Sequence, residues 1–376
     1  MIEAREFVDA ALERGFEWYA GVPCSFLTPF IDYVLDDARR AGSRLHYLSM
    51  ANEGDAVALN AGIALAGAQG PWRRLGISMM QNSGLGNAVS PLTSLTWTFR
   101  LPQLLIVTWR GEPGLHDEPQ HALMGPITPA MLETMEIAWE SFPTQSAAIG
   151  PALERARASM ADTGRPYALV MHKGSVAAAP RRPAAGAEES RAGLGGRAAR
   201  TAELISRGVP PEARPSRGEA LRTVVAHTPV GSTAVLASTG HCGRELYAIA
   251  DRPSQLYMVG SLGCVVPLAL GLALARPDLR VVALDGDGAA LMRLGAFATV
   301  GAYRPANLYH LLLDNGAHDS TGGQATVSAS TSFAAIAAAC GYAQALETDT
   351  LEDLAAWLDA PPLPGPRFAR LRIRPG

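Results

Sequence analysis

This chain has little net charge and no long apolar run. Its 32 Lys and Arg against 35 Asp and Glu leave a net charge of −3, which excludes the strongly basic surface that a nucleic-acid-binding protein needs. No apolar run approaches the roughly 20 residues of a membrane span, and the opening residues, MIEAREFVDAAL, lack the charged-then-apolar pattern of a signal peptide. We therefore expect a cytoplasmic protein with neither nucleic-acid nor membrane partners.

Cysteine and lysine are also scarce. The chain has four cysteines, which form no CxxC pair and no metal-ligand spacing, so we expect reduced thiols rather than disulfides or a zinc site. Lys173 is the only lysine, which leaves arginine as the main cation for an anionic ligand. The chain does have 48% hydrophobic residues over 376 positions, enough for two globular domains with cores of their own.

The composition changes between residues 179 and 215. This stretch is rich in Ala, Arg, Gly and Pro and poor in large apolar residues, which indicates an exposed linker with a short helix near 198–206. It separates a first domain, 1–178, from a second, 216–376. Both alternate strand and helix patterns, typical of an α/β fold with a doubly wound parallel sheet. The expected strands are LGISMM, LLIVTW and YALVMH in the first domain and AVLAST, LYMVG, VVALDG and LYHLLL in the second.

Residues 285–324 repeat one arrangement twice. The hydrophobic runs 281–284 and 308–313 each end in small and metal-binding residues, DGDGA and DNGA. Because ligands of α/β sheets bind at the carboxyl ends of strands, Asp287 and Asn315 are expected at one point beside a glycine turn. Their carboxylate and amide oxygens suit a divalent cation. The repeat therefore predicts a site for a metal ion and a diphosphate.

The residues around Asp287 suit phosphate for separate reasons. Gly286 and Gly288 allow a sharp turn and a close approach of the backbone to phosphate oxygens, and a helix from Ala289 onward would present N–H groups to an anion. Magnesium takes roughly six oxygen ligands, shared among carboxylates, carbonyls, water and substrate phosphates. The carbonyl of Ala317 is a further candidate ligand.

In the first domain, Glu53 begins a helix pattern directly after a strand-like segment that ends at Met50. A glutamate in a first helical turn commonly complements the helix dipole, which is the structural explanation for it. Asp55 is a second carboxylate nearby, but it lies two residues on and is expected on another face of the helix. From these residues alone, both the structural and the functional role of Glu53 stay open.

Two polar segments of this domain are candidates for contact with a substrate. The segment QNSGLGNAVSPLTSL, which contains Asn82, offers small residues and amides around a turn. The segment WRGEPGLHDEPQHALMG follows a strand and contains Arg110, His116 and His121 among other polar residues. Functional residues collect in loops at strand ends, although surface loops also carry histidines that have no role.

The paired segments DGDGAALMRLGA and LLLDNGAHDSTGGQ resemble the signature of thiamin diphosphate enzymes, and their fuller wording resembles that of the phosphonopyruvate decarboxylases. The resemblance covers nearly the whole chain apart from the linker. It implies a pyrimidine-binding domain followed by a diphosphate-binding domain, without the central third domain of larger relatives. It also implies that Mg²⁺ is bound by Asp287, Asn315 and the carbonyl of Ala317.

The same resemblance implies roles for other residues. The segment ANEGDA matches the one that carries the catalytic glutamate, so Glu53 would hydrogen bond the cofactor's pyrimidine ring, and Leu262 would support its bent conformation. Many relatives have a Lys or Thr near the positions of His241 and Cys242 in this chain. The remaining expected contacts are Thr239, Gly240, Gly286, Gly288, Ala289 and His318 for the cofactor, Ser25 in GVPCSFLTPF with Asn82 and Arg110 for the substrate, and His116 and His121 for proton transfer.

The implied activity is decarboxylation of 3-phosphonopyruvate to phosphonoacetaldehyde and carbon dioxide, a step of phosphonate and antibiotic biosynthesis. Its implied partners are a small anionic 2-oxo acid and further copies of the chain, at least a homodimer with active sites between subunits. Sulfopyruvate decarboxylase or another 2-oxo acid decarboxylase is the alternative within the class. A non-catalytic nucleotide-binding module is the alternative outside it, but it would have no use for Glu53. A nicotinamide dehydrogenase is disfavoured because no GxGxxG follows an early strand.

Overall fold

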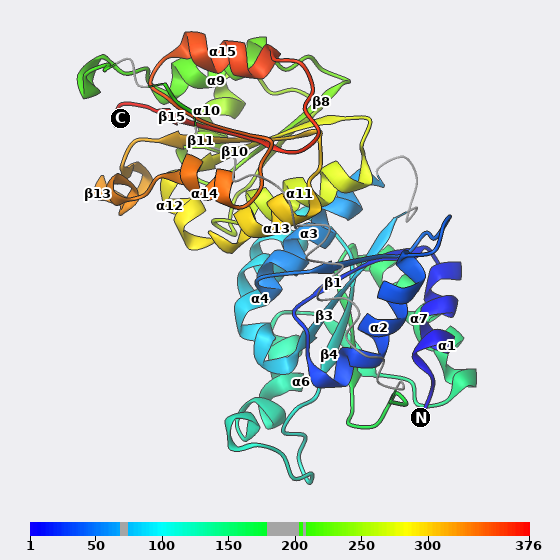
Figure 1. The fold of residues 1–376 in the computed structure, drawn as a ribbon. Coiled ribbons are helices and arrows are strands. Elements are labelled where there is room, and N and C mark those ends of the chain that lie inside the picture. Colours follow the sequence, from blue (N-terminus) through cyan, green and yellow to red (C-terminus); the bar gives the residue numbers. More distant parts are fainter. Residues whose placement is uncertain (68–73, 179–202, 206–207) are drawn as a thin grey trace. The chain divides into compact units, whose positions relative to one another are not determined.

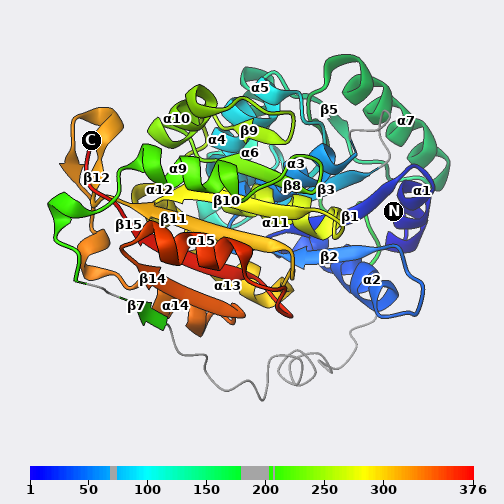
Figure 2. The ribbon, with the colours of Figure 1, turned by 90° about the horizontal axis from the view of Figure 1, so that it is seen from above.

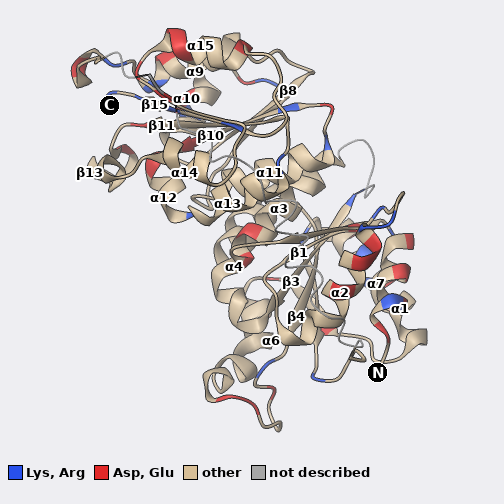
Figure 3. Ribbon diagram, viewed as in Figure 1, with Lys and Arg blue, Asp and Glu red and all other residues tan. Residues whose placement is uncertain are grey.

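A computed structural model of the chain describes residues 1–67, 74–178, 203–205 and 208–376. The chain divides into two compact units, unit 1 (Met1–Pro183) and unit 2 (Ala184–Gly376), each built on its own sheet. Charged residues of both signs are interspersed on the helices and loops of each unit (Figure 3). Within the described residues, no helix is long and apolar enough to cross a membrane.

Unit 1 contains a six-stranded sheet in which every neighbouring pair of strands is parallel. Its central strands are continuous apolar runs, and all residues of the strands over 104–108 and 167–171 are buried, as expected for a parallel sheet covered on both faces. Across the sheet the order is β2 (His46–Ser49), β1 (Phe16–Gly21), β3 (Leu75–Gln81), β4 (Leu104–Thr108), β6 (Tyr167–Met171) and β5 (Ala138–Ser141).

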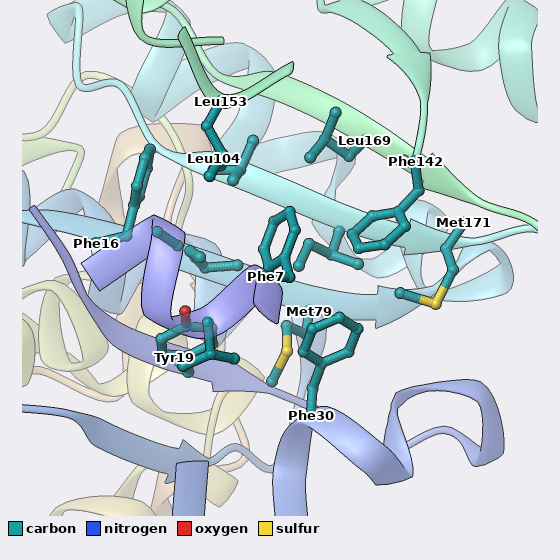
Figure 4. Close-up of a cluster of buried hydrophobic side chains, with 14 of the residues drawn as sticks. Phe7, Phe16, Tyr19, Phe30, Met79, Leu104, Phe142, Leu153, Leu169 and Met171 are labelled. Carbon is teal, nitrogen blue, oxygen red and sulfur yellow. The ribbon is translucent and has the colours of Figure 1, made fainter. Parts of the chain in front are cut away.

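Helices cover both faces of this sheet (Figure 1). Between the sheet and one of the two helix layers, the rings of Phe7, Phe30 and Phe142 lie with their centroids 4.8 to 5.7 Å apart and form the centre of the core (Figure 4). The first layer consists of α1 (Ala4–Glu13), α2 (Thr28–Ala38) and α7 (Ser146–Thr163), and the second of α3 (Glu53–Ala66), α4 (Leu85–Pro91) and α6 (Met124–Thr134), with α5 (Trp97–Phe99) after α4.

Small residues let α3 lie close to β3. A Cβ atom on Gly76 of β3 would come within 2.0 Å of the Asn60 side-chain oxygen, so only glycine fits there. Asn60 in turn donates to Ser78 at 2.8 Å inside the core. At its N-terminus α3 is capped by Asn52, whose side chain accepts from the backbone N–H of Gly54 at 2.8 Å. These contacts fix the position of the helix that Glu53 begins.

Unit 2 contains a seven-stranded sheet, again parallel throughout (Figure 2 views it from the side of the helices over 217–226 and 351–359). A separate antiparallel pair, β12 (Ala317–His318) and β13 (Gln324–Ala325), follows one of its central strands. Across the sheet the order is β7 (Glu203–Ile205), β14 (Gln344–Thr348), β15 (Arg367–Arg372), β11 (Leu308–Asp314), β10 (Arg280–Gly286), β8 (Thr233–Ala237) and β9 (Gln255–Tyr257).

The sheet of unit 2 is also covered on both faces (Figure 1). Ser216 and Glu219 form the capping box that their spacing predicts, and they begin the first helix of the unit. One layer consists of α9 (Arg217–Ala226), α10 (His241–Ile249) and α15 (Leu351–Asp359), and the other of α11 (Val265–Ala275), α13 (Gly295–Tyr303) and α14 (Phe333–Ala339), with the short α12 (Asp287–Met292) after β10.

The observed architecture confirms the expected α/β fold with two parallel sheets, and each strand run expected from the sequence forms a strand. The predicted linker 179–215 lies largely outside the described residues, which resume at 203–205 and 208. The short helix predicted near 198–206 is wrong at its described end, because 203–205 pair with β14 as strand β7. A three-residue edge strand carries too little periodicity to be read from sequence.

Candidate functional site

A cavity opens in unit 2 at the carboxyl ends of β8, β10 and β11, where parallel sheets bind ligands. The structure places all the cofactor residues expected in this unit along its wall: Thr239, Gly240, Leu262, Gly286, Asp287, Gly288, Ala289, Asn315, Ala317 and His318. The wall also includes residues that the sequence did not single out, among them Arg217, Ser238, Asp285, Asp319 and Ser320.

Asp287 lies at the start of α12 and is 3% exposed. The hydroxyl of Thr326 donates a hydrogen bond to its Oδ2 atom. Burial raises the pKa of the Asp287 carboxyl, the bond from Thr326 opposes the rise, and the negative charge of Asp314 adds to it. A cation beside Asp287 would replace the stabilisation that this carboxylate loses when it leaves water.

Asn315 follows β11 and is held by two contacts. Its Nδ2 atom donates to Asp319 Oδ2 at 2.5 Å, and its Oδ1 atom accepts from the backbone N–H of Ala317 at 3.2 Å. The preceding residue, Asp314, is occupied elsewhere, because its Oδ2 atom lies 2.5 Å from a guanidinium nitrogen of Arg370. Of the Asp-Asn pair, Asn315 is therefore the member that faces the cavity.

Glycine is required at two places in the wall. Gly240 has a φ of +98°, a conformation that side-chain-bearing residues rarely adopt, and it precedes the first turn of α10. A Cβ atom on Gly288 would come within 2.4 Å of the His318 ring, so this ring lies directly against the GDG turn.

Two residues after Gly240, burial raises the pKa of the Cys242 thiol to about 12, so this thiol adds no negative charge to the wall at neutral pH.

Arg217 is the most informative residue that sequence reasoning missed. Its guanidinium lies 2.6 Å from Glu245 and 2.5 Å from Asp319, and the residue is 7% exposed. An arginine in the first turn of a helix opposes the helix dipole. That unfavourable placement is the signal that could have indicated a further role, which the structure shows to be an ion pair at the edge of the cavity.

The residues of the cavity fit a magnesium ion with a diphosphate. A carboxylate at Asp287, an amide oxygen at Asn315 and the carbonyl of Ala317 are hard oxygen donors. In the described parts of the chain, no three His, Cys, Asp or Glu side chains are grouped so as to hold a metal ion by themselves. This donor set is too small to enclose the ion, which suits Mg²⁺ because Mg²⁺ retains water and phosphate ligands.

In unit 1, Glu53 is half-buried at the start of α3. The side chain of Asn87 donates to its Oε2 atom at 2.8 Å. A Cβ atom on Gly84 would come within 2.6 Å of its Oε1 atom, so the carboxylate lies against the backbone that follows β3. Asp55, by contrast, is 1% exposed, and the other residues of α3 from Gly54 to Ile63 are buried as well.

The side chain of Asn82 is buried and hydrogen bonds to the backbone that follows β4. Its Nδ2 atom donates to the carbonyl of Arg110 at 2.8 Å and to Thr128 at 2.9 Å. Arg110 itself forms a two-pronged ion pair with Asp117, with a shortest distance of 2.5 Å, and lies 5.1 Å from the centre of the Phe26 ring. The Arg110 guanidinium holds the pKa of Asp117 well below its usual range.

The remaining predicted residues of unit 1 differ in exposure. Ser25 begins a short 3-10 helix and is exposed, as is His116. His121 is 4% exposed, and within the described residues its Nδ1 atom has no hydrogen-bond partner. Sequence reasoning missed His172. Its two ring nitrogens lie 2.9 Å from Glu112, in the loop after β4, and 3.0 Å from Ser141, at the end of β5, so His172 connects these two segments.

Comparison with known proteins agrees with this geometry. Residues 238–361 match the family model described as thiamine pyrophosphate enzyme, C-terminal TPP binding domain. Over 100% of its length the chain is 43% identical to phosphonopyruvate decarboxylase from Streptomyces viridochromogenes, of which it covers 89%. It is 28% identical to sulfopyruvate decarboxylase from Methanosarcina acetivorans, covering 85% of this chain and 77% of that one.

Solved structures of other decarboxylases have a similar fold. Benzoylformate decarboxylase from Polynucleobacter necessarius matches 100% of this chain and 99% of its own with a TM-score of 0.70, at 13% identity, which is a likeness of fold alone. The identity to the Streptomyces viridochromogenes protein extends through both units, and the matched C-terminal domain contains most of the cavity wall. This chain therefore belongs to the phosphonopyruvate decarboxylase family, whose cofactor is thiamin diphosphate with a divalent metal ion.

Proposed function

We propose that this chain decarboxylates 3-phosphonopyruvate to phosphonoacetaldehyde and carbon dioxide, with thiamin diphosphate and Mg²⁺, as a step of phosphonate biosynthesis in the cytoplasm. Two observations together carry the proposal. The unit 2 cavity brings together the Asp287 carboxylate, the Asn315 amide and the glycine turn, and the whole chain is 43% identical to a phosphonopyruvate decarboxylase. The cavity supports the cofactor by its own geometry, and the identity supports the substrate.

Unit 2 would bind the diphosphate end of the cofactor. Asp287, Asn315 and the carbonyl of Ala317 would supply the protein ligands of Mg²⁺. Gly240 allows the left-handed turn before α10, Gly288 lets the GDG turn lie against the His318 ring, and the N-terminus of α10 offers N–H groups to the phosphates. Bound there, the cofactor supplies the electron sink for loss of carbon dioxide.

Unit 1 would supply proton transfer and substrate binding. Glu53 would hold a proton at the pyrimidine ring, and its half-buried carboxylate is already oriented by Asn87. Arg110 would bind the doubly charged phosphonate together with Ser25 through the Nη1 side of its guanidinium, since its Nε and Nη2 atoms already donate to Asp117. Asn82 would act by holding the backbone of Arg110.

The two histidines of the loop after β4 are the candidates for proton transfer to the reacting carbon. His121 is the better candidate, because its Nδ1 atom is buried and has no hydrogen-bond partner within the described residues, whereas His116 is exposed to solvent. We further propose a homodimer or larger homo-oligomer, in which the cofactor joins unit 1 of one subunit to unit 2 of another. A carboxylate for the pyrimidine and an anchor for the diphosphate are both needed, and they reside in different units.

A decisive test compares three 2-oxo acids. The full-length protein is freed of metal and cofactor, then supplied with phosphonopyruvate, sulfopyruvate or pyruvate, with and without thiamin diphosphate and Mg²⁺. We expect the highest kcat/KM for phosphonopyruvate, and turnover only when both additions are present. Preference for sulfopyruvate would assign the chain to the alternative activity. Turnover that needs no thiamin diphosphate, or no turnover of any of the three, would overturn the proposal.

A further inference from the structure

The segment that follows Asn315 folds back on itself beside the cavity. The strands β12 and β13 pair antiparallel, with Ala317 opposite Ala325, and the backbone N–H of Thr326 donates to the carbonyl of Gly316 at 2.9 Å. We call residues 317–326 the metal-site hairpin. Its two ends therefore lie next to each other. Thr326 stands at the second end, and Asp319 begins the short 3-10 turn that joins the two strands. The side chain of each reaches a candidate metal ligand.

In the turn of the hairpin, Asp319 holds Asn315. Its Oδ2 atom accepts from Asn315 Nδ2 at 2.5 Å. An amide side chain has one donor end and one acceptor end, and either can be turned toward a ligand unless a partner fixes it. The Asp319 carboxylate can only accept, so it fixes the Asn315 amide with Nδ2 toward Asp319 and Oδ1 on the opposite side. Asn315 Oδ1 accepts one hydrogen bond, from Ala317, which leaves a lone pair for a cation.

At the second end, Thr326 holds Asp287. The Thr326 hydroxyl donates to Oδ2 of Asp287 and leaves the Oδ1 atom of that carboxylate to other partners. The bond also keeps the carboxylate from rotating. The two candidate metal ligands come from different strand ends, after β10 and β11, and are thus oriented by a single hairpin.

The hairpin is itself anchored to the core of unit 2. Asp319 forms an ion pair with Arg217 at 2.5 Å, and Arg217 also lies 2.6 Å from Glu245 on α10. Removing one member of a buried ion pair is costly, because the other charge is left without a partner. Arg217 therefore fixes Asp319 more firmly than an exposed salt bridge would, and through Asp319 it fixes Asn315.

We propose that Asp319 and Thr326 are positioning residues for the Mg²⁺ site, with Arg217 as the anchor that holds Asp319 in place. The inference rests on the proposed function, since it takes Asp287 and Asn315 as the metal ligands. Partners that orient metal ligands commonly contribute about 10–100-fold to metal affinity. The Asp319 and Thr326 side chains set the affinity for Mg²⁺ and leave the chemical step unchanged once the metal is bound.

The test measures Mg²⁺ affinity directly. Mg²⁺ is titrated by calorimetry into full-length protein that contains thiamin diphosphate, for wild type, Thr326→Val, Thr326→Ser and Asp319→Asn. We expect Thr326→Val and Asp319→Asn each to weaken Mg²⁺ binding about 10–100-fold. Thr326→Ser keeps the hydroxyl and should restore wild-type affinity. At saturating Mg²⁺, the kcat of Thr326→Val should return to within about twofold of wild type, because the hydroxyl contacts a ligand rather than the substrate.

Two sites in unit 2 outside the cavity wall provide matched controls. Thr223→Val removes a hydroxyl that bonds only a helix carbonyl, and Asp278→Asn breaks an exposed ion pair with Arg276. Both should bind Mg²⁺ as wild type does. If Asp319→Asn fails to fold, Thr326→Val still decides the matter, since it is nearly isosteric. Unchanged Mg²⁺ affinity in folded Thr326→Val overturns the inference, whereas a wild type that binds no Mg²⁺ with thiamin diphosphate overturns the proposed function itself.

Discussion

The polar residues of unit 2 and unit 1 are held in different ways. Around the unit 2 cavity, Asp287, Asn315 and Asp319 each have a side-chain partner, and Arg217 forms an ion pair with Asp319. In unit 1 the predicted residues range from buried to exposed, and Glu53 is half-buried with one amide donor. A metal and diphosphate anchor needs rigid geometry, whereas groups that exchange protons or receive a substrate must remain accessible.

This contrast assigns separate tasks to the two units. Unit 2 would determine how tightly cofactor and metal are bound, and unit 1 would determine the rate of the reaction and the affinity for substrate. Variants in each unit should therefore change different measured quantities. A variant that changes the quantity assigned to the other unit would break the comparison.

The largest effect is expected for Glu53→Gln. Glutamine keeps the shape of the side chain and can still contact Asn87, but it cannot take up or release a proton. We expect kcat to fall by about 10²–10⁴-fold with little change in the dissociation constant of thiamin diphosphate. Steady-state kinetics and calorimetry measure the two quantities, with Glu13→Gln, at a side chain that is 79% exposed, as the control. A matching loss of cofactor affinity would instead make Glu53 an anchoring residue.

A smaller effect, on a different quantity, is expected for Asp287→Asn. The variant exchanges a charged ligand for a neutral one at the proposed Mg²⁺ site. Loss of a residue that only orients a metal ligand lowers metal affinity by about 10–100-fold, so we expect a fall of about 100-fold when a ligand itself is changed. Calorimetric titration with thiamin diphosphate present gives the value. Asp278→Asn serves as the control. Unaltered Mg²⁺ affinity in Asp287→Asn would remove this residue from the ligand set.

Arg110→Met sharpens the comparison within unit 1. Hydrogen bonds to charged groups contribute roughly 1.5–3 kcal/mol, so KM for phosphonopyruvate should rise by about 10–100-fold while Mg²⁺ affinity stays at the wild-type value. Arg155→Met is the matched control, because Arg155 is exposed and pairs with Glu140 at 2.7 Å. An unchanged KM would mean that another group receives the phosphonate.

The smallest effect concerns stability without ligands. Folding raises the pKa of Asp287, so the folded protein keeps this proton over a pH range in which the unfolded chain has lost it. The contribution of this group to stability is therefore highest at low pH and declines as pH rises from the ordinary value of 3.8 through the higher folded-state pKa. Above that window the buried carboxylate destabilises the cofactor-free protein.

Asp287→Asn should accordingly raise the Tm of metal-free protein at neutral pH, by about 2–4 °C for each kcal/mol gained. The gain should shrink as the pH is lowered through the window. Differential scanning calorimetry at pH 4 and pH 7.5 makes the comparison, with Asp278→Asn as the control. A lower Tm for Asp287→Asn at neutral pH would show that this carboxylate stabilises the fold even without metal.

Most of the fold and half of the site could be predicted from local patterns. The runs that became β4, β6, β10 and β11 are continuous and apolar because helices cover both faces of a parallel sheet, and such runs are visible in sequence. The glycines and acidic residues after β10 and β11 were equally visible. The edge strand β7 was not, because three residues give no reliable period.

The contacts that hold the site were beyond local patterns. Arg217 and Asp319 are separated by 102 residues in the chain, and Thr326 by 39 from Asp287, so no spacing rule links them. His172 meets Ser141 and Glu112 only because the ends of two strands and a loop converge. Such partners depend on which strands become neighbours in the sheet.

The sequence by itself determined the family, the parallel α/β architecture and the residue types at the strand ends, since these follow from apolar runs, glycine turns and recognisable motifs. Only the tertiary structure decided which of those residues are oriented and by what. Buried polar groups need partners, and the sheet order places Asp319, Thr326 and Arg217 beside the metal-binding segment. The orientation of the proposed metal ligands is thus a property of the fold rather than of the motif.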